Sequence, residues 1–321
     1  MSKRIVITDH EFKSLEEIEQ IISETDAVLE VNNVTDKLSV LEVTRGADVV
    51  LIDYAPVDRD VAEGLAPGAV VIRAGIGYDN IDVSALRELG VRACNVPDYG
   101  ASTVADHTVM LALAVHRKVR EQHQAITKSE DGWAQAIDFG PLLDMADATY
   151  GLVGSGQIAR LVAKRVQAFG ATVIAADPYV DPAAMDELGI ELVSRDELVQ
   201  RADMISLHAP LTPETRHIIG YAQLASMKPG VTLVNTSRGP LLDTVAAAEA
   251  LHAGKLGGLG LDVFETEPLE PSHPIRNAPR TLLTPHSAFY SERSQRNMQR
   301  YAAEEAVRAC RGEALRCEVG L

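Results

Sequence analysis

The sequence predicts an α/β protein made of two doubly wound parallel-sheet domains, one inserted into the other. Three observations support this fold class. Residues 1–100 alternate apolar runs with helical patterns, a glycine-rich turn starts a second such series at mid-chain, and the C-terminal stretch returns to a helix. Near-continuous apolar strands that alternate with helices are typical of parallel sheets covered on both faces. The expected domains are residues 101–288 and, joined together, residues 1–100 with 289–321.

Apolar runs predict the strands of the first domain, and apolar residues three or four positions apart predict its helices. One helical pattern contains Leu15, Ile18, Ile21 and Ile22, and a second covers Val83–Leu89. The expected strands are Arg4–Thr8, Ala27–Val31, Ala47–Asp53, Ala69–Ala74 and Val91–Val96. A longer helix is expected from about Ala101 to Val119, followed by a polar section, Lys128–Gly140, that contains Trp133.

The turn at mid-chain has the spacing of a dinucleotide-binding fingerprint. An apolar run ending at Val153 leads into Gly154-Ser155-Gly156, a helical pattern follows to Phe169, and a second strand ends at Asp177. Ala159 completes the pattern G-x-G-x-x-A, and the acid lies about twenty residues further on. Such glycines let the backbone approach a pyrophosphate, whose charge is met by amides at the helix N-terminus. A plain glycine turn is the alternative, but strand, helix and acid in register favour a cofactor site.

The second domain continues with further strands and ends in a helical pattern. The expected strands are Met204–His208, Val231–Asn235, Leu259–Val263 and Thr281–Thr284. The final pattern contains Met298, Tyr301, Ala302 and Ala306 and is expected to cross back to the first domain. A cleft between two such domains is where ligands usually bind.

Composition excludes several classes of function. Hydrophobic residues make up 46% and charged residues 24% of the 321 residues, which is ordinary for a soluble globular protein. The net charge of −16 argues against binding to nucleic-acid phosphates or anionic membranes. The start Met1-Ser-Lys-Arg leads directly into a strand, and Cys94, Cys310 and Cys317 lack the spacing of metal ligands. We therefore expect a cytoplasmic protein without a metal site, a membrane segment or a nucleic-acid partner.

Three residue types at predicted strand ends suit hydride transfer to a 2-oxo acid. Arg238 follows one strand and can hold a carboxylate with its forked guanidinium. His286 follows another and can donate a proton near neutral pH, and Glu267 could keep that imidazole protonated and oriented. Taken alone, each residue has a structural alternative: a surface ion pair for Arg238, a loop histidine for His286 and a solvated acidic loop for Glu267. Arg73 could likewise merely pair with Asp79.

Seven motifs in order resemble the D-isomer-specific 2-hydroxyacid dehydrogenase family over essentially the whole chain. They are RAGIGYDNID (73–82), CNVPDYG…VADH (94–107), GLVGSGQIA (151–159), SLHAPLTPETRHIIG (206–220), NTSRGPLLD (235–243), GLDVFETEP (260–268) and TPHSAFYSE (284–292). The resemblance implies a Rossmann NAD-binding domain inserted into a flavodoxin-like substrate domain. It also implies a homodimer joined through the NAD-binding domain, with the Ala101–Gly140 region in the interface.

The resemblance implies a role for each residue that matches a family motif. His286 would be the catalytic acid/base, Glu267 its partner, and Arg238 would bind substrate. Four positions would form the substrate pocket: Arg73, Ile76, Gly77 and Phe289. Asp262 would contact the nicotinamide amide, and Val104 would lie near the nicotinamide ring. The other expected NAD contacts are Gly154, Ser155, Gly156, Gln157, Ile158, Asp177, Ala209, Pro210, Thr215, Thr236, Ser237, Arg238 and His286.

Within the family, TPHSAFYSE and CNVP look most like the C-terminal binding protein branch and its bacterial relatives. This chain departs from that branch at Phe289, where the branch has tryptophan, and at Ile76, where it has serine. Its preferred oxo acid therefore cannot be carried over. The chain ends at Leu321, which predicts no regulatory C-terminal domain, and no cationic cluster beside Arg73 announces a phosphorylated substrate.

Two functions from different classes fit these motifs. The first is an NAD-dependent oxidoreductase that interconverts a 2-oxo acid and a D-2-hydroxy acid. The second is an NADH-sensing interaction protein like the corepressors of the C-terminal binding protein branch, which keep the same three catalytic residue types. NADH oxidation with a panel of 2-oxo acids would distinguish the two.

Overall fold

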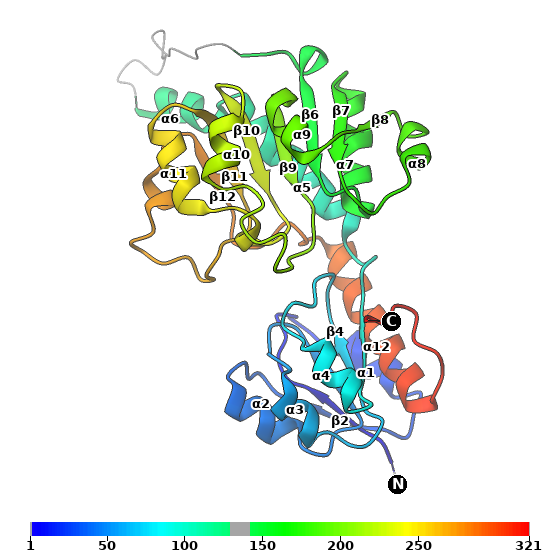
Figure 1. The fold of residues 1–321 in the computed structure, drawn as a ribbon. Helices are drawn as coiled ribbons and strands as arrows, with labels where there is room; N and C mark the ends of the chain where they lie inside the picture. Colours follow the sequence, from blue (N-terminus) through cyan, green and yellow to red (C-terminus); the bar gives the residue numbers. More distant parts are fainter. Residues whose placement is uncertain (1, 129–141, 321) are drawn as a thin grey trace. The chain divides into compact units, whose positions relative to one another are not determined.

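The computed structural model describes residues 2–128 and 142–320, and the chain divides into two compact units (Figure 1). The first unit combines Met1–Gly100 with Tyr290–Leu321, and the second is Ala101–Phe289. Trp133 and most of the polar section predicted around it lie outside the described residues. Among the described helices, none is long and apolar enough to cross a membrane.

The first unit is built on a sheet whose described strands run in the order β2-β1-β3-β4-β5, all paired in parallel. This is the flavodoxin-like strand order. The strands are β1 (Arg4–Ile7), β2 (Val28–Val31), β3 (Val49–Ile52), β4 (Val70–Arg73) and β5 (Arg92–Asn95). The helices are α1 (Glu16–Ile22), α2 (Lys37–Thr44), α3 (Arg59–Gly64), α4 (Val83–Glu88) and α12 (Glu292–Arg311).

The C-terminal helix α12 belongs to the first unit because one face of it is apolar. Met298, Ala302 and Ala306 lie on that face and are buried, and the helix contacts α1, β3 and β4. The Ser291 side chain accepts a hydrogen bond from the amide of Ser294 at the start of the helix, and Gly312 ends it in the left-handed conformation.

The second unit has a larger sheet, whose described strands run β12-β11-β10-β9-β6-β7-β8, again all parallel. The six strands β11-β10-β9-β6-β7-β8 have the Rossmann order, and β12 adds a seventh strand at the edge beside β11. The strands are β6 (Thr149–Val153), β7 (Thr172–Ala176), β8 (Ile190–Leu192), β9 (Met204–Leu207), β10 (Val231–Asn235), β11 (Leu256–Leu261) and β12 (Thr281–Leu283).

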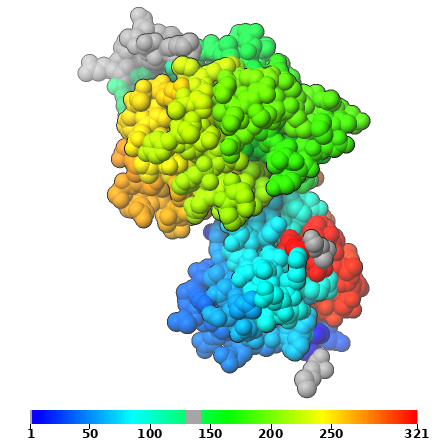
Figure 2. All heavy atoms as spheres, viewed as in Figure 1, coloured from blue at the N-terminus to red at the C-terminus, as the bar shows by residue number. Residues whose placement is uncertain are grey.

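Helices cover both faces of this sheet, as its apolar strands require. On one face α5 contacts β9 to β12 and α7 contacts β6 and β7, while α9 and α11 pack on the other face and α10 lies between them. In Figure 2 the residues of α9, α10 and α11 fall in the yellow-green to yellow part of the colour bar. The described helices are α5 (Ala101–His116), α6 (Val119–Lys128), α7 (Gln157–Ala168), α8 (Pro182–Asp186), α9 (Arg195–Arg201), α10 (Tyr221–Ser226) and α11 (Thr244–His252).

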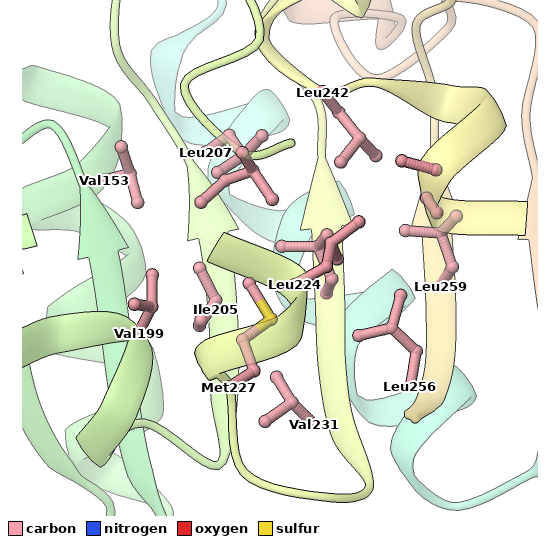
Figure 3. Close-up of a cluster of buried hydrophobic side chains, with 14 of the residues drawn as sticks. Val153, Val199, Ile205, Leu207, Leu224, Met227, Val231, Leu242, Leu256 and Leu259 are labelled. Carbon is pink, nitrogen blue, oxygen red and sulfur yellow. The ribbon is translucent and has the colours of Figure 1, made fainter. Parts of the chain in front are cut away.

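A buried apolar cluster holds the sheet against α9, α10 and α11 (Figure 3). Ile205 and Leu233 from the central strands meet Leu224 and Met227, and all four side chains are at most 3% exposed. Burying such side chains removes apolar area from water, which is the main favourable term in folding. The carboxyl ends of the strands are thereby held at one rigid edge.

Two predicted elements differ from the structure, and one strand was not predicted. The single helix expected from Ala101 to Val119 ends at His116, because Lys118 takes a positive φ of 53° before α6 begins. Strand β8, only Ile190–Leu192, was not predicted, and β11 lies at Leu256–Leu261 rather than Leu259–Val263. Gly257, Gly258 and Gly260 weaken the apolar signal of β11.

Candidate active site

Two predicted catalytic residues form a close pair in the second unit. His286 Nδ1 lies 2.6 Å from Glu267 Oε2, and the amide of Phe264 donates to Glu267 Oε1 at 2.8 Å. Burial alone would raise the pKa of Glu267, but the hydrogen bond and charge of His286, the Phe264 amide and the charge of Arg238 together lower it. Because Nδ1 faces the carboxylate, Nε2 is the ring nitrogen that can present a proton to a reacting oxygen.

The loop that carries His286 is fixed by a buried carboxylate at the end of β11. Asp262 is 0% exposed, and its oxygens accept hydrogen bonds from the Thr284 hydroxyl, the Ser287 amide and the Ala288 amide at 2.5, 2.9 and 2.9 Å. The Asp262 carbonyl accepts from the His286 amide at 2.7 Å. The backbone of His286 has a φ of 52°, a conformation that residues other than glycine adopt uncommonly. The surrounding hydrogen bonds support it.

Arg238 is positioned by the turn that follows β10. The Asn235 side chain donates to the Arg238 carbonyl at 2.8 Å and accepts from the Ser237 amide at 3.0 Å, which closes the turn. Gly239 packs so tightly that an added Cβ would come within 1.9 Å of the Phe264 carbonyl carbon. The turn that carries Arg238 therefore touches the segment that leads to Glu267.

The fingerprint turn has the shape that a dinucleotide requires. Gly154 has a φ of 91°, and a Cβ there would lie 2.7 Å from the Ala209 amide nitrogen, whereas a Cβ on Gly156 would meet no atom within 4 Å. No acidic residue lies in the first turn of α7, so the helix N-terminus can accept an anion. A cavity of about 580 Å³ adjoins the turn, lined in part by Gly156, Asp177, Ala209, Pro210 and Thr215. These residues fit the adenosine and pyrophosphate of NAD.

Asp177 has a role in the turn besides the one predicted for it. Its Oδ2 accepts from the Ser155 amide and hydroxyl at 2.8 and 3.1 Å, and its Oδ1 accepts from the Tyr179 amide at 3.0 Å. A carboxylate offers about four acceptor positions, so one position on Oδ1 is still available to a ribose hydroxyl. Arg195, at the start of α9, also lines this cavity, a cation that the sequence did not place near Asp177.

The cavity also contains a histidine that sequence reasoning did not single out. His208 follows β9, its Nε2 lies 2.7 Å from Ser206 Oγ, and burial lowers its pKa to about 3. It is therefore neutral at physiological pH and adds no positive charge for a phosphate.

The other predicted cofactor positions of the second unit occupy the same edge of the sheet or the helix beside it. Val104 is 6% exposed, and its carbonyl accepts from the Thr108 hydroxyl, whose oxygen lies 2.7 Å from Thr236 Oγ1. The Ser237 hydroxyl donates to the Ala209 carbonyl at 2.9 Å, joining the ends of β9 and β10. Gln157 and Ile158 begin α7, and Phe289 stands edge-on to His286 with ring centroids 6.4 Å apart.

The predicted substrate residues lie in the first unit: Arg73 is the last residue of β4, and Ile76 and Gly77 lie in the loop that follows it. Arg73 Nη2 is 3.3 Å from Asp53 Oδ1 at the end of β3, a partner that sequence reasoning did not identify. Arg73 is 11% exposed in its side chain, and its Nε is buried without a hydrogen-bond partner in the described structure. The Asn95 side chain donates to the Ile76 carbonyl at 2.6 Å and thereby holds the loop.

Comparison with known proteins identifies the family. Residues 109–288 match the model of the D-isomer specific 2-hydroxyacid dehydrogenase NAD-binding domain, which is more than half of the chain. The chain belongs to this dehydrogenase family. The cofactor of its second unit is therefore NAD, as the fingerprint predicted. A glyoxylate reductase from Korarchaeum cryptofilum is 36% identical over 260 residues, which is 80% of this chain and 78% of that protein.

Two further relatives match nearly the whole length of this chain. The D-3-phosphoglycerate dehydrogenase of Methanocaldococcus jannaschii is 38% identical over 316 residues, or 97% of this chain, which spans only 58% of that protein. The crystal structure of a glyoxylate reductase from Paecilomyes thermophila superposes with a TM-score of 0.89 at 30% identity, covering 99% of this chain and 98% of that one. The predicted C-terminal binding protein branch stays a prediction, because these relatives carry other names.

Changing Glu267 to Gln tests the catalytic pair. The amide removes the negative charge that the Glu267 carboxylate places 2.6 Å from the His286 ring. We expect the basic limb of the pH profile of kcat/KM for a 2-oxo acid to move to lower pH. Glu270→Gln, a neighbouring exposed acid, serves as the control and should leave the limb in place. If the basic limb of Glu267→Gln coincides with that of the wild-type protein, the Glu267 carboxylate does not assist proton donation by His286.

Changing Asp177 to Ala tests the choice of nicotinamide nucleotide. A 2′-phosphate would be repelled by the Asp177 carboxylate, which the Ser155 amide holds in place. Arg195 offsets this repulsion little, because its side chain is exposed to solvent screening and its Nε lies 3.7 Å from Asp196 Oδ1. We expect the wild-type protein to prefer NAD(H) over NADP(H) by about tenfold or more in kcat/KM. Asp177→Ala should reduce this preference, chiefly by weakening NAD(H), and Asp181→Ala should not. Equal wild-type efficiency with both cofactors would contradict the assignment of Asp177.

Proposed function

We propose that the protein is an NAD-dependent D-2-hydroxyacid dehydrogenase that also runs as a 2-oxo acid reductase. The observation that carries this proposal is the 2.6 Å contact between His286 Nδ1 and Glu267 Oε2, in the segments that follow β12 and β11 of an NAD-binding domain. Carbonyl reduction needs a proton donor where a hydride arrives, and an imidazole held by a carboxylate supplies one near neutral pH.

Each catalytic residue has a defined part in this reaction. When bound, the nicotinamide nucleotide would provide the hydride for the carbonyl carbon and take it up in the reverse direction. His286 Nε2 donates its proton to the carbonyl oxygen, and Glu267 stabilises the charged imidazole until that transfer and orients the ring afterwards. Arg238 binds the substrate carboxylate and polarises the carbonyl, and Asp262 accepts a hydrogen bond from the nicotinamide carboxamide. Phe289 lines the substrate pocket beside His286.

We propose that Arg73 and the amides of the 76–77 loop bind a substrate carboxylate. Two features support it: the Arg73 guanidinium has a buried Nε that lacks a partner in the described structure, and Asn95 fixes the loop. Buried donors without a partner are rare, and a ligand is one explanation for them. The Asp53 carboxylate beside Arg73 offsets its charge, which disfavours a doubly charged phosphate on the substrate.

We also propose a homodimer formed through the NAD-binding domain. Helix α6 supports it, because no residue of that helix is buried in the single chain while Val119 and Ile126 are 51% and 46% exposed. Met110 on α5 is 43% exposed as well. Exposed apolar side chains on neighbouring helices are typical of interfaces.

A substrate panel tests the proposed function. We expect NADH oxidation with glyoxylate, pyruvate, hydroxypyruvate or 4-methylthio-2-oxobutyrate, and a kcat/KM for 3-phosphohydroxypyruvate about tenfold or more below that for hydroxypyruvate, because Asp53 repels the phosphate. His286→Ala should lose most turnover and bind NADH nearly as well as the wild-type protein. Tight NADH binding without turnover on any of these acids would instead favour an NADH-sensing interaction protein. A preference for the phosphorylated acid would refute the role given to Asp53.

A further inference from the structure

A line of hydrogen bonds joins helix α5 to the buried Asp262 carboxylate. His107 Nε2 lies 3.0 Å from Thr284 Oγ1, and Thr284 Oγ1 lies 2.5 Å from Asp262 Oδ1. The direct distance from His107 Nε2 to Asp262 Oδ1 is 3.6 Å. The side chains of His107 and Asp262 are 18% and 1% exposed, so water competes little for these hydrogen bonds.

The chemistry of the three groups fixes the direction of each hydrogen bond. A carboxylate only accepts, so the single hydroxyl hydrogen of Thr284 points to Asp262. The Thr284 oxygen must then accept from His107, which places a hydrogen on Nε2. Burial lowers the pKa of His107, although the charge of Asp262 opposes this, and a neutral ring with one N–H suits the arrangement.

This chain of bonds controls what Asp262 can offer to a ligand. Asp262 Oδ1 accepts from Thr284 and Ser287, and Oδ2 accepts from Ala288. Of about four acceptor positions, one on Oδ2 is left over among the described residues. In the proposed function that position meets the nicotinamide carboxamide. Its direction depends on the orientation of the carboxylate, which Thr284 holds from one side.

We infer that His107 is a positioning residue for the nicotinamide site, acting on Asp262 through Thr284. This inference rests on the proposed function, because that function places the carboxamide at Asp262. His107 would touch neither cofactor nor substrate. Its N–H keeps the Thr284 hydroxyl turned toward Asp262, and the polarised bond strengthens the next one in line.

Binding measurements with two ligands test this inference. NADH contains the nicotinamide, whereas ADP-ribose lacks it and keeps the adenosine and pyrophosphate that the cavity around Gly156 and Asp177 would take. We expect His107→Leu to weaken NADH about five- to tenfold, the scale of one lost hydrogen bond, and to leave the affinity for ADP-ribose within about twofold. His107→Gln can place an amide N–H near the position of Nε2 and should restore NADH binding to within about threefold. A purely structural role would not be rescued in this way.

A double-mutant cycle tests whether the effect passes through Thr284. His107→Leu combined with Thr284→Val should weaken NADH no more than the stronger single change does. His116→Leu is the matched control, a histidine on the same helix that contacts the Leu143 carbonyl, and should bind both ligands normally. The inference is overturned if His107→Leu binds NADH like the wild-type protein, if it loses NADH and ADP-ribose equally, or if the two changes are additive. Wild-type protein that binds ADP-ribose as tightly as NADH would instead refute the proposed nicotinamide contact, and the inference with it.

Discussion

The loop that carries His286 depends on the hydrogen bonds to the buried carboxylate of Asp262. A buried carboxylate is costly unless hydrogen bonds satisfy it, and here Thr284, Ser287 and Ala288 all donate to it. Those three residues bracket His286, so the same bonds that satisfy the charge hold the histidine in a backbone conformation with a φ of 52°. The contact with Glu267 follows from that conformation.

The parallel sheet explains why residues distant in sequence come together at this edge. Strands β10, β11 and β12 are neighbours, and their carboxyl ends lead to Arg238, Asp262 and His286. A doubly wound sheet places functional groups at this edge, since each strand ends there. The apolar cluster beneath α9, α10 and α11 keeps the strands in register, so the side chains that follow them are fixed too.

Local patterns in the sequence predicted the sheets and the fingerprint turn, because apolar runs and glycine spacing are local signals. The pairing of His286 with Glu267 was implied by the family resemblance, since spacing alone left a structural alternative open for each residue. Three neighbours of the predicted site residues could not be predicted: Asp53 beside Arg73, Arg195 in the cavity with Asp177, and His107 beside Thr284. Each is brought to its neighbour by the fold, from a different segment of the sequence. Strand β8 was missed because Glu191 interrupts its short apolar run, and the break between α5 and α6 was missed because Lys118 carries no turn signal. The role of Asp177 within its own turn also needed coordinates, since an acid at a strand end looks the same whether it meets ribose or Ser155.

The most direct test of this account is the proton NMR signal of the His286 Nδ1 hydrogen, assigned by its loss in His286→Ala. A hydrogen shared across 2.6 Å with a carboxylate should resonate far downfield in the wild-type protein. Asp262→Asn places an NH₂ group, which cannot accept, where one carboxylate oxygen accepts now. If Asp262 holds the loop, this change should abolish or strongly shift the signal. An unchanged signal in Asp262→Asn would show that the pair between His286 and Glu267 forms without that anchor and would contradict the account.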